Sequence, residues 1–242
     1  LDTLQTLTAV RSLGFDRLAT LTSAQTLTVN RANTLDRLAQ IALSTAISAT
    51  RAATLGFPTT GLPAAASFTT TGAYTYNFPR NCQFVDRIVL GGGGGGGGAS
   101  FAFTPAQGGD AGAFAWDTLQ RGVDFSYTET AITGTVGAGG SAGTGAGNGG
   151  NGGNSTATIN GNTITGTGGT GRGGSGTKNG DAVTSGNANS GKDVSLNSQT
   201  YAGGATSTGT TANVPGAGGR GGNAFSNGNA GARGQVWFYA YQ

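Results

Sequence analysis

A chain of 242 residues in which 49 are glycine, 36% are hydrophobic and only 10% are charged cannot build an ordinary side-chain core along its whole length. A net charge of +3 from scattered Lys and Arg gives no argument for nucleic-acid binding, and no apolar run approaches the roughly 18 residues of a membrane span. Histidine is absent and Cys82 is the only cysteine, which excludes an internal disulfide and a thiolate zinc cluster. We therefore expect no metal, no cofactor, no nucleic-acid partner and no membrane insertion. The chain contains no Met and begins at Leu1, so we expect it to be part of a longer protein.

Residues 1–60 consist of three twenty-residue blocks that align without gaps, with Arg11, Arg31 and Arg51 at equivalent positions. A repeat this short cannot bury a core alone and usually stacks or oligomerises. We predict that residues 1–60 form a parallel homotrimeric stalk, and the number three agrees with the family resemblance given below. Twenty residues is a poor helical period, because about 100° per residue turns the apolar stripe by roughly 200° per block. Each block is therefore interpreted as a short helix plus an extended, Thr-rich piece such as residues 23–29, with an ordinary amphipathic helix as the alternative. The residues predicted to face other subunits are Leu7, Leu27 and Ile47.

The composition changes after the stalk. Residues 61–66 are predicted to be a linker, and residues 67–242 a glycine-rich head. Alternating apolar residues predict two β-strands within about 68–90 and a terminal strand at 235–241. The simplest topology pairs the terminal strand with the first two, so that the whole glycine region is an insertion in a small β module.

Glycine in the head keeps a three-residue period. Its longest register runs through Gly216, Gly219, Gly222, Gly228, Gly231 and Gly234, and only Phe225 interrupts it. A flexible linker has no reason to keep a period, whereas a polyproline II helix has about 3 residues per turn. The fold class predicted is therefore mostly β and irregular: a small β module with an inserted lattice of polyglycine or polyproline II helices over about residues 131–234, preceded by a trimeric stalk with short helices.

Three asparagines share the glycine register, namely Asn148, Asn151 and Asn154. Their side chains could bind sugar or water, but we favour a structural role in which they satisfy backbone groups that the glycine lattice leaves open.

Acidic residues recur every seven positions at Asp110, Asp117 and Asp124. Without histidine, a carboxylate hydrolase is the only plausible enzyme class, because two positioned carboxyl groups suffice for glycoside hydrolysis. Solvated turn residues explain the same spacing more simply. We therefore expect that the protein is not an enzyme.

Several segments in order resemble a known family. The run FTTTGAYTYNFP, a strand that ends in Gly91–Gly98, the segment VGAGGSAG and the closing RGQVWFYAYQ resemble the glycine-rich domain of phage tail proteins. The chain is most similar to the glycine-rich minor tail proteins of phages that infect actinobacteria, the mycobacteriophage-like group. The resemblance implies a virion protein, usually trimeric, located at the tail tip or on a tail fibre and contacting other tail proteins.

Recognition is expected on loops, because a lattice made of backbone offers few distinctive groups along its sides. Residues 177–201 are the most polar connection, and we predict that they contact a cell-envelope carbohydrate. The candidate receptor-binding residues are Lys178, Asn179, Asp181, Asn197, Tyr201 and Trp116. Tyr201 is the predicted stacking residue. A tail-associated cell-wall glycan depolymerase and a purely structural tail spacer are the alternatives.

Overall fold

The structure is a computed structural model, and it describes residues 4–6, 26–28, 61–100, 104–184 and 192–242. The chain divides into two compact units, Leu1–Pro58 and Thr59–Gln242. In the first unit, β1 (Leu4–Thr6) pairs antiparallel with β2 (Thr26–Thr28), with Gln5 opposite Leu27. Strand β2 lies within the Thr-rich piece predicted to be extended. The predicted short helices, the three equivalent arginines and two of the three intersubunit positions lie outside the described residues.

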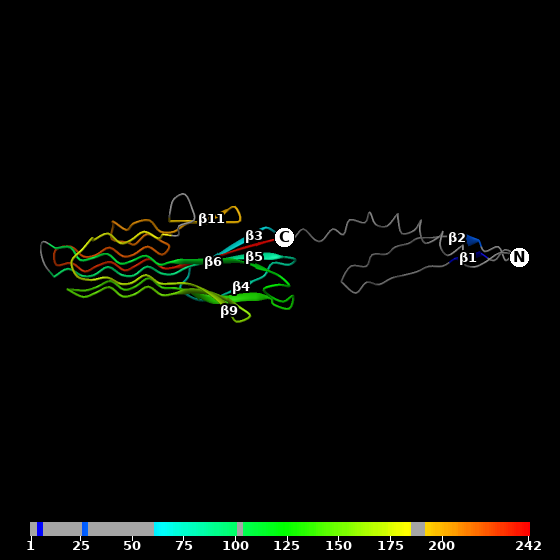
Figure 1. The fold of residues 1–242 in the computed structure, drawn as a ribbon, viewed down its shortest axis with the longest axis horizontal. Helices are drawn as coiled ribbons and strands as arrows, with labels where there is room; N and C mark the ends of the chain where they lie inside the picture. The colour runs from blue at the N-terminus through cyan, green and yellow to red at the C-terminus, as the bar shows by residue number, and fades with distance from the viewer. Residues whose placement is uncertain (1–3, 7–25, 29–60, 101–103, 185–191) are drawn as a thin grey trace. The chain divides into compact units, whose positions relative to one another are not determined.

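The second unit contains two four-stranded antiparallel sheets (Figure 1). The first sheet has the order β3 (Ala64–Phe68), β12 (Gln235–Tyr241), β5 (Phe84–Leu90) and β6 (Phe114–Gln120). The second has the order β4 (Gly72–Asn77), β7 (Ala131–Val136), β8 (Ser155–Ile159) and β9 (Asn162–Gly166). A small hairpin, β10 (Val194–Leu196) and β11 (Gln199–Tyr201), completes the strands of this unit.

The main core lies between the two sheets. Strand β12 buries Val236, Phe238 and Ala240, while the residues between them stay partly exposed, as period-two alternation requires. Phe238 stacks on Tyr76 of the opposite sheet with ring centroids 4.2 Å apart. The other buried residues of this core are Tyr74, Cys82, Val85, Val89, Leu119, Phe125, Ile132, Val136, Ala157 and Ile159.

The terminal strand has a central place, as its apolar faces predict, but its partners differ from the expected ones. It pairs with β3 and β5, not with β4. The strand expected to begin at about residue 68 corresponds to β4, which starts only at Gly72, while β3 lies for most of its length within residues 61–66, which were predicted to be a linker. The chain crosses from one sheet to the other between Phe68 and Gly72. Gly72 has a φ of 110°, a conformation that only glycine adopts readily, and this permits the change of direction.

Strands β6 to β11 were not predicted, because the region after Gly91 was interpreted as a glycine-rich insertion whose other residues only connect the glycine segments. Strands β7, β8 and β9 are rich in Thr and Ile, which suit a pleated surface. Asn160 and Gly161 connect β8 to β9 with positive φ at both positions, the backbone of a two-residue hairpin turn. The head therefore contains a larger β structure than the predicted small module.

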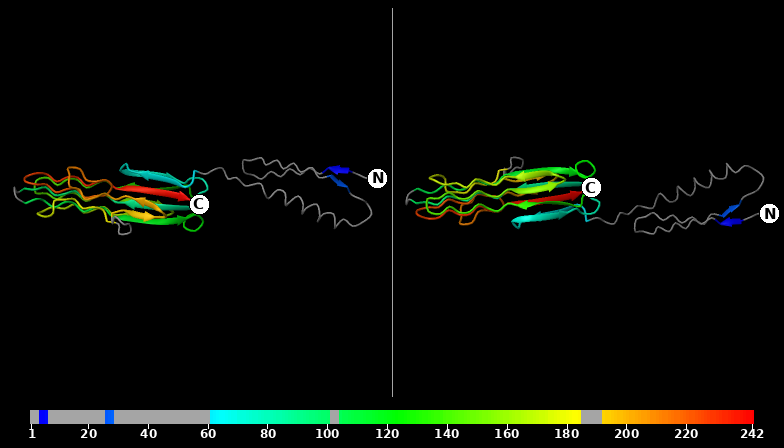
Figure 2. Two further views of the ribbon diagram at one scale, coloured as in Figure 1. Left: turned by 90° about the horizontal axis from the view of Figure 1, so that it is seen from above. Right: turned by 90° about the horizontal axis from the view of Figure 1, so that it is seen from below.

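Beyond the strands, glycine-rich segments run side by side (Figures 1 and 2). The described residues contain no helix, and in particular none long and apolar enough to cross a membrane. Successive N–H groups of residues 91–99 donate hydrogen bonds to three other segments in turn, and the order of the three segments repeats every three residues. Gly92 bonds to Gly153, Gly93 to Ala232 and Gly94 to Asp110, and the cycle then repeats with Gly95 to Gly150, Gly96 to Asn229 and Gly97 to Gln107.

The carbonyls of the same stretch accept bonds from three further segments, which contain Gly140, Gly169 and Gly219. Residues 91–99 thus bond to six neighbours, whereas a strand in a sheet bonds to two. The approach between segments is very close. A Cβ atom at Gly94 would lie 2.1 Å from the carbonyl oxygen of Thr170, so no larger residue fits at this position.

The predicted structural role of the asparagines is confirmed for two of them. The Oδ1 of Asn154 accepts a bond from Gly168 N, and the Oδ1 of Asn151 accepts one from Gly171 N, both at 2.9 Å. These side chains supply acceptors to backbone N–H groups three residues apart. The asparagines that share the glycine register therefore help to hold neighbouring glycine-rich segments together.

Candidate functional site: a groove on the outer face of the first sheet

The predicted receptor-binding residues do not gather at one place. Tyr201 is buried, with 6% of its surface exposed, and it packs with Ile88 and Val194. Its ring lies 5.8 Å from that of Trp237, and burial raises the pKa of its hydroxyl. Trp116 packs against the same small cluster. Both rings are thus used for packing, and Tyr201 does not present a face for stacking.

Three other predicted residues belong to the glycine-rich segments. The carbonyl of Lys178 accepts a bond from Gly221 N, and Asp181 exchanges backbone bonds with Gly109 and Gly218. The carbonyl oxygen of Asn179 closely approaches Gly108. Partial burial of the Asp181 carboxyl, followed by the nearby charge of Asp110, raises its pKa. These residues are held by their main chains and do not meet Asn197.

Asn197 occupies a defined position in the turn between β10 and β11. It has a φ of 47° and Ser198 a φ of 63°, so the two residues form the tight hairpin connection with positive φ at both positions. Asn tolerates this left-handed conformation better than most residues. The turn directs the Asn197 carboxamide onto the first sheet, where its Nδ2 donates to Asp86 Oδ1 and to the Tyr241 hydroxyl oxygen, both at 2.8 Å.

Asp86 is the centre of this polar cluster. It is fully buried on β5, and its Oδ1 also accepts a hydrogen bond from the Thr118 hydroxyl at 2.7 Å. Its Oδ2 has no hydrogen-bond partner among the described residues. Burial raises the pKa of the Asp86 carboxyl above its ordinary value, although the bonds from Thr118, Asn197 and Tyr241 act in the opposite direction.

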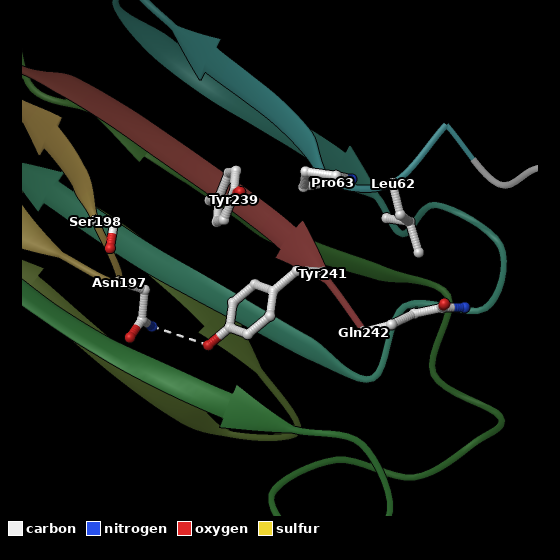
Figure 3. A pocket seen from close by; sticks show the side chains of 7 residues that line it. All are labelled: Leu62, Pro63, Asn197, Ser198, Tyr239, Tyr241 and Gln242. Carbon is white, nitrogen blue, oxygen red and sulfur yellow. Dashed lines mark hydrogen bonds between the residues drawn. The ribbon is translucent and has the colours of Figure 1, made fainter.

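Next to this cluster lies an open groove of about 540 Å³ (Figure 3). Tyr239 and Tyr241 stand two residues apart on β12, so both rings lie on the outer face of the sheet. Their centroids are 5.5 Å apart, and Phe84 stacks against Tyr241 at 5.3 Å. The residues that line the groove are Leu62, Pro63, Asn197, Ser198, Tyr239, Tyr241 and Gln242.

Sequence reasoning included Asn197 but missed its partners. The pair Asn197 and Asp86 is separated by 111 residues, so no local pattern links them. Tyr239 and Tyr241 lie in the terminal strand that the sequence predicts at 235–241, but no binding site was predicted there. The sequence did place two tyrosines on one face of the terminal strand, and such an aromatic face is either packed against another segment or open to a ligand.

The acidic residues at seven-residue spacing have separate partners. Asp117 pairs with Arg87 at 2.5 Å, Asp110 pairs with Arg172 at 2.5 Å, and Asp124 accepts a bond from Gln120 N at 2.7 Å. The Arg87 side chain is fully buried, and it also donates to carbonyl oxygens of Ala157 and Asn162 in the second sheet. This arginine therefore connects the two sheets.

Comparison with known proteins identifies the glycine-rich part of the chain. Residues 69–241 match the glycine-rich domain family, and the chain belongs to that family. It is 45% identical over 185 residues to the Gene 32 protein of Mycobacterium phage L5, and the aligned region covers 74% of this chain and 82% of that protein. It is 47% identical over 76 residues to the Gene 32 protein of Mycobacterium phage D29, covering 31% and 34% of the two chains.

These relatives confirm the coarser part of the resemblance, which is a phage protein with a glycine-rich domain. The location in the tail, the homotrimer and the host contact stay predictions.

Proposed function

We propose that this protein is a structural and host-attachment component of a phage tail, carried at the tail tip or on a fibre. The observation that carries the proposal is the hydrogen bonding of residues 91–99 to six surrounding segments. Cross-linking in six directions gives a stiff support, and loops on stiff supports commonly carry binding functions. The phage relatives are consistent with a virion protein.

We also propose that the glycine-rich segments are polyproline II helices. With about 3 residues per turn and no internal hydrogen bonds, such a helix points successive N–H groups in three directions about 120° apart. The rotation of acceptors from Gly153 to Ala232 to Asp110, and its repetition three residues later, fits this geometry. The direct check is an experimental structure, in which most of these residues should have φ near −75° and ψ near +145°.

The stalk is proposed to assemble three copies through residues 1–60. Each repeat carries too little apolar surface to fold alone, and association supplies the missing burial. Analytical ultracentrifugation of the complete 242-residue chain at micromolar concentration should give a trimer. A monomer under these conditions would contradict the assembly.

The location and role are tested on particles. Immunogold labelling with antibodies raised against the complete chain should mark the tail of the phage that encodes it, and the same antibodies should reduce adsorption to host cells. Antibodies against a capsid protein are the control. Labelling of the capsid alone, or adsorption that the antibodies leave unchanged, would argue against an attachment role.

A further inference from the structure

The outer groove of the first sheet has an aromatic floor that is already supported. Tyr239 and Tyr241 are both partly exposed, and Phe84 stacks on Tyr241 with ring centroids 5.3 Å apart. An exposed aromatic face binds flat ligands with C–H groups on one side, and sugar rings have this form. The two tyrosines offer such a surface on a rigid central strand (Figure 3).

The polar groups at the margin suit a ligand rich in hydroxyls. Asn197 uses its amide hydrogens on Asp86 and Tyr241, which leaves its carbonyl oxygen as an acceptor at the groove. Ser198 adds a hydroxyl to the same lining, whereas the Gln242 carboxamide is used in a hydrogen bond from its Nε2 to Asn81 O. A small number of placed polar groups beside aromatic side chains is the usual composition of a specific small-ligand site.

The groove is held in position before any ligand arrives. The buried Asp86 accepts bonds from Thr118 and Asn197, and the Asn197 carboxamide in turn fixes the Tyr241 hydroxyl. These bonds join β5, β6, β12 and the turn between β10 and β11. Because the side chains are already ordered, binding loses little conformational entropy.

The charge of the lining decides the class of ligand. The seven lining residues include no Lys, Arg, Asp or Glu, so the groove offers no counter-charge to a phosphate or a carboxylate. Its volume of about 540 Å³ falls within the range of ligand pockets, roughly 300–1,000 Å³. We propose that this groove binds a neutral saccharide, and that it, rather than Tyr201, supplies the stacking surface. The inference rests on the proposed host attachment and names the site and ligand class.

The test uses the complete 242-residue chain and the neutral polysaccharide fraction of delipidated, deproteinised mycobacterial cell walls. Saturation-transfer NMR should detect binding to oligosaccharides released from this fraction. Replacement of Tyr239→Ala should weaken the binding by about tenfold, because it removes half of the stacking surface. Tyr239→Phe keeps the ring and should bind as the unmodified chain does.

The matched control is Tyr127→Ala, which removes another tyrosine ring, 71% exposed and outside the groove. It should leave the affinity unchanged. Circular dichroism and the melting temperature establish that each variant is folded. The proposal is overturned if the unmodified chain does not bind the fraction, or if the two alanine variants bind equally. It is also overturned if Tyr239→Ala changes the oligomeric state, which would make the groove an intersubunit contact.

Failure of the saccharide-binding proposal can be distinguished from failure of the host-attachment proposal. A chain that labels the tail but binds no saccharide overturns the groove alone. A chain that binds the saccharide through Tyr239 but is absent from the tail overturns the attachment role alone.

Discussion

The packing of the glycine-rich segments makes a strong prediction for Gly231→Ala. A Cβ atom at this position would lie 2.1 Å from the carbonyl oxygen of Gly93 and 2.5 Å from its carbonyl carbon. Ordinary contacts between heavy atoms are about 3.5 Å or longer. One segment must therefore move by roughly 1 Å, and the obstacle is backbone, which cannot rotate away as a side chain would.

The movement affects hydrogen bonds on both sides of the contact. Gly231 N donates to Gly140 O at 2.9 Å, and Gly93 N donates to Ala232 O at 2.8 Å. The loss of two such bonds costs about 2 kcal/mol, and overpacking costs about 1–3 kcal/mol. We therefore expect Gly231→Ala to lower the free energy of unfolding by about 3–5 kcal/mol, out of a total of about 5–15 kcal/mol for a typical domain.

The assay is thermal unfolding followed by circular dichroism. A change of this size should lower the melting temperature by about 6–20 °C, at about 2–4 °C per kcal/mol for a domain of this size. The control is Gly209→Ala, where a Cβ atom meets nothing within 4 Å. That variant should stay within about 0.5 kcal/mol of the unmodified chain. Equal melting temperatures for the two variants would refute the close-packing argument.

The remaining predictions concern polar groups. Arg87→Ala should lower the free energy of unfolding by about 3–5 kcal/mol, measured by urea unfolding, because it leaves Asp117 and buried carbonyls without their donor. Arg172→Ala breaks an exposed ion pair, so it should leave the midpoint of urea unfolding nearly unchanged. Because burial raises the pKa of Asp86, the folded chain binds more protons than the unfolded chain between the ordinary value near 4 and the raised value, so stability is lost as pH rises through this window. Asp86→Asn should remove that loss of stability. If the free energy of unfolding of this variant depends on pH in the same way as that of the unmodified chain, the prediction is wrong. Asn154→Ala should cost about 1 kcal/mol and speed hydrogen exchange at Gly168 N, and unchanged exchange would exclude the side-chain bond.

The sequence predicted those features that depend on a short period. The terminal strand could be predicted because Val236, Phe238 and Ala240 alternate with Trp237 and Tyr239. The structural role of Asn151 and Asn154 could be predicted because both share the three-residue register of the glycines. In each case a local repeat determines which groups point in the same direction.

Features that depend on distant pairing could not be predicted in the same way. The presence of β3 in the predicted linker depends on its pairing with β12, and the positive φ of Gly72 marks where the chain then changes sheet. The groove requires Asn197 to meet Asp86 across 111 residues, and Tyr201 is buried because the hairpin folds back onto the sheet. Polarity alone made residues 177–201 look like one exposed loop, whereas its residues serve several parts of the structure.

The bonding of residues 91–99 to six neighbours also has a mechanical consequence. A strand at the edge of a sheet can be peeled away one hydrogen bond at a time, because its bonds lie in one plane. A segment whose bonds point in several directions has no such plane of separation. Force applied to any one of the surrounding segments is shared through Gly92–Ala99 with the others. The glycine-rich segments should therefore resist shear together, and separate only when many hydrogen bonds break at once.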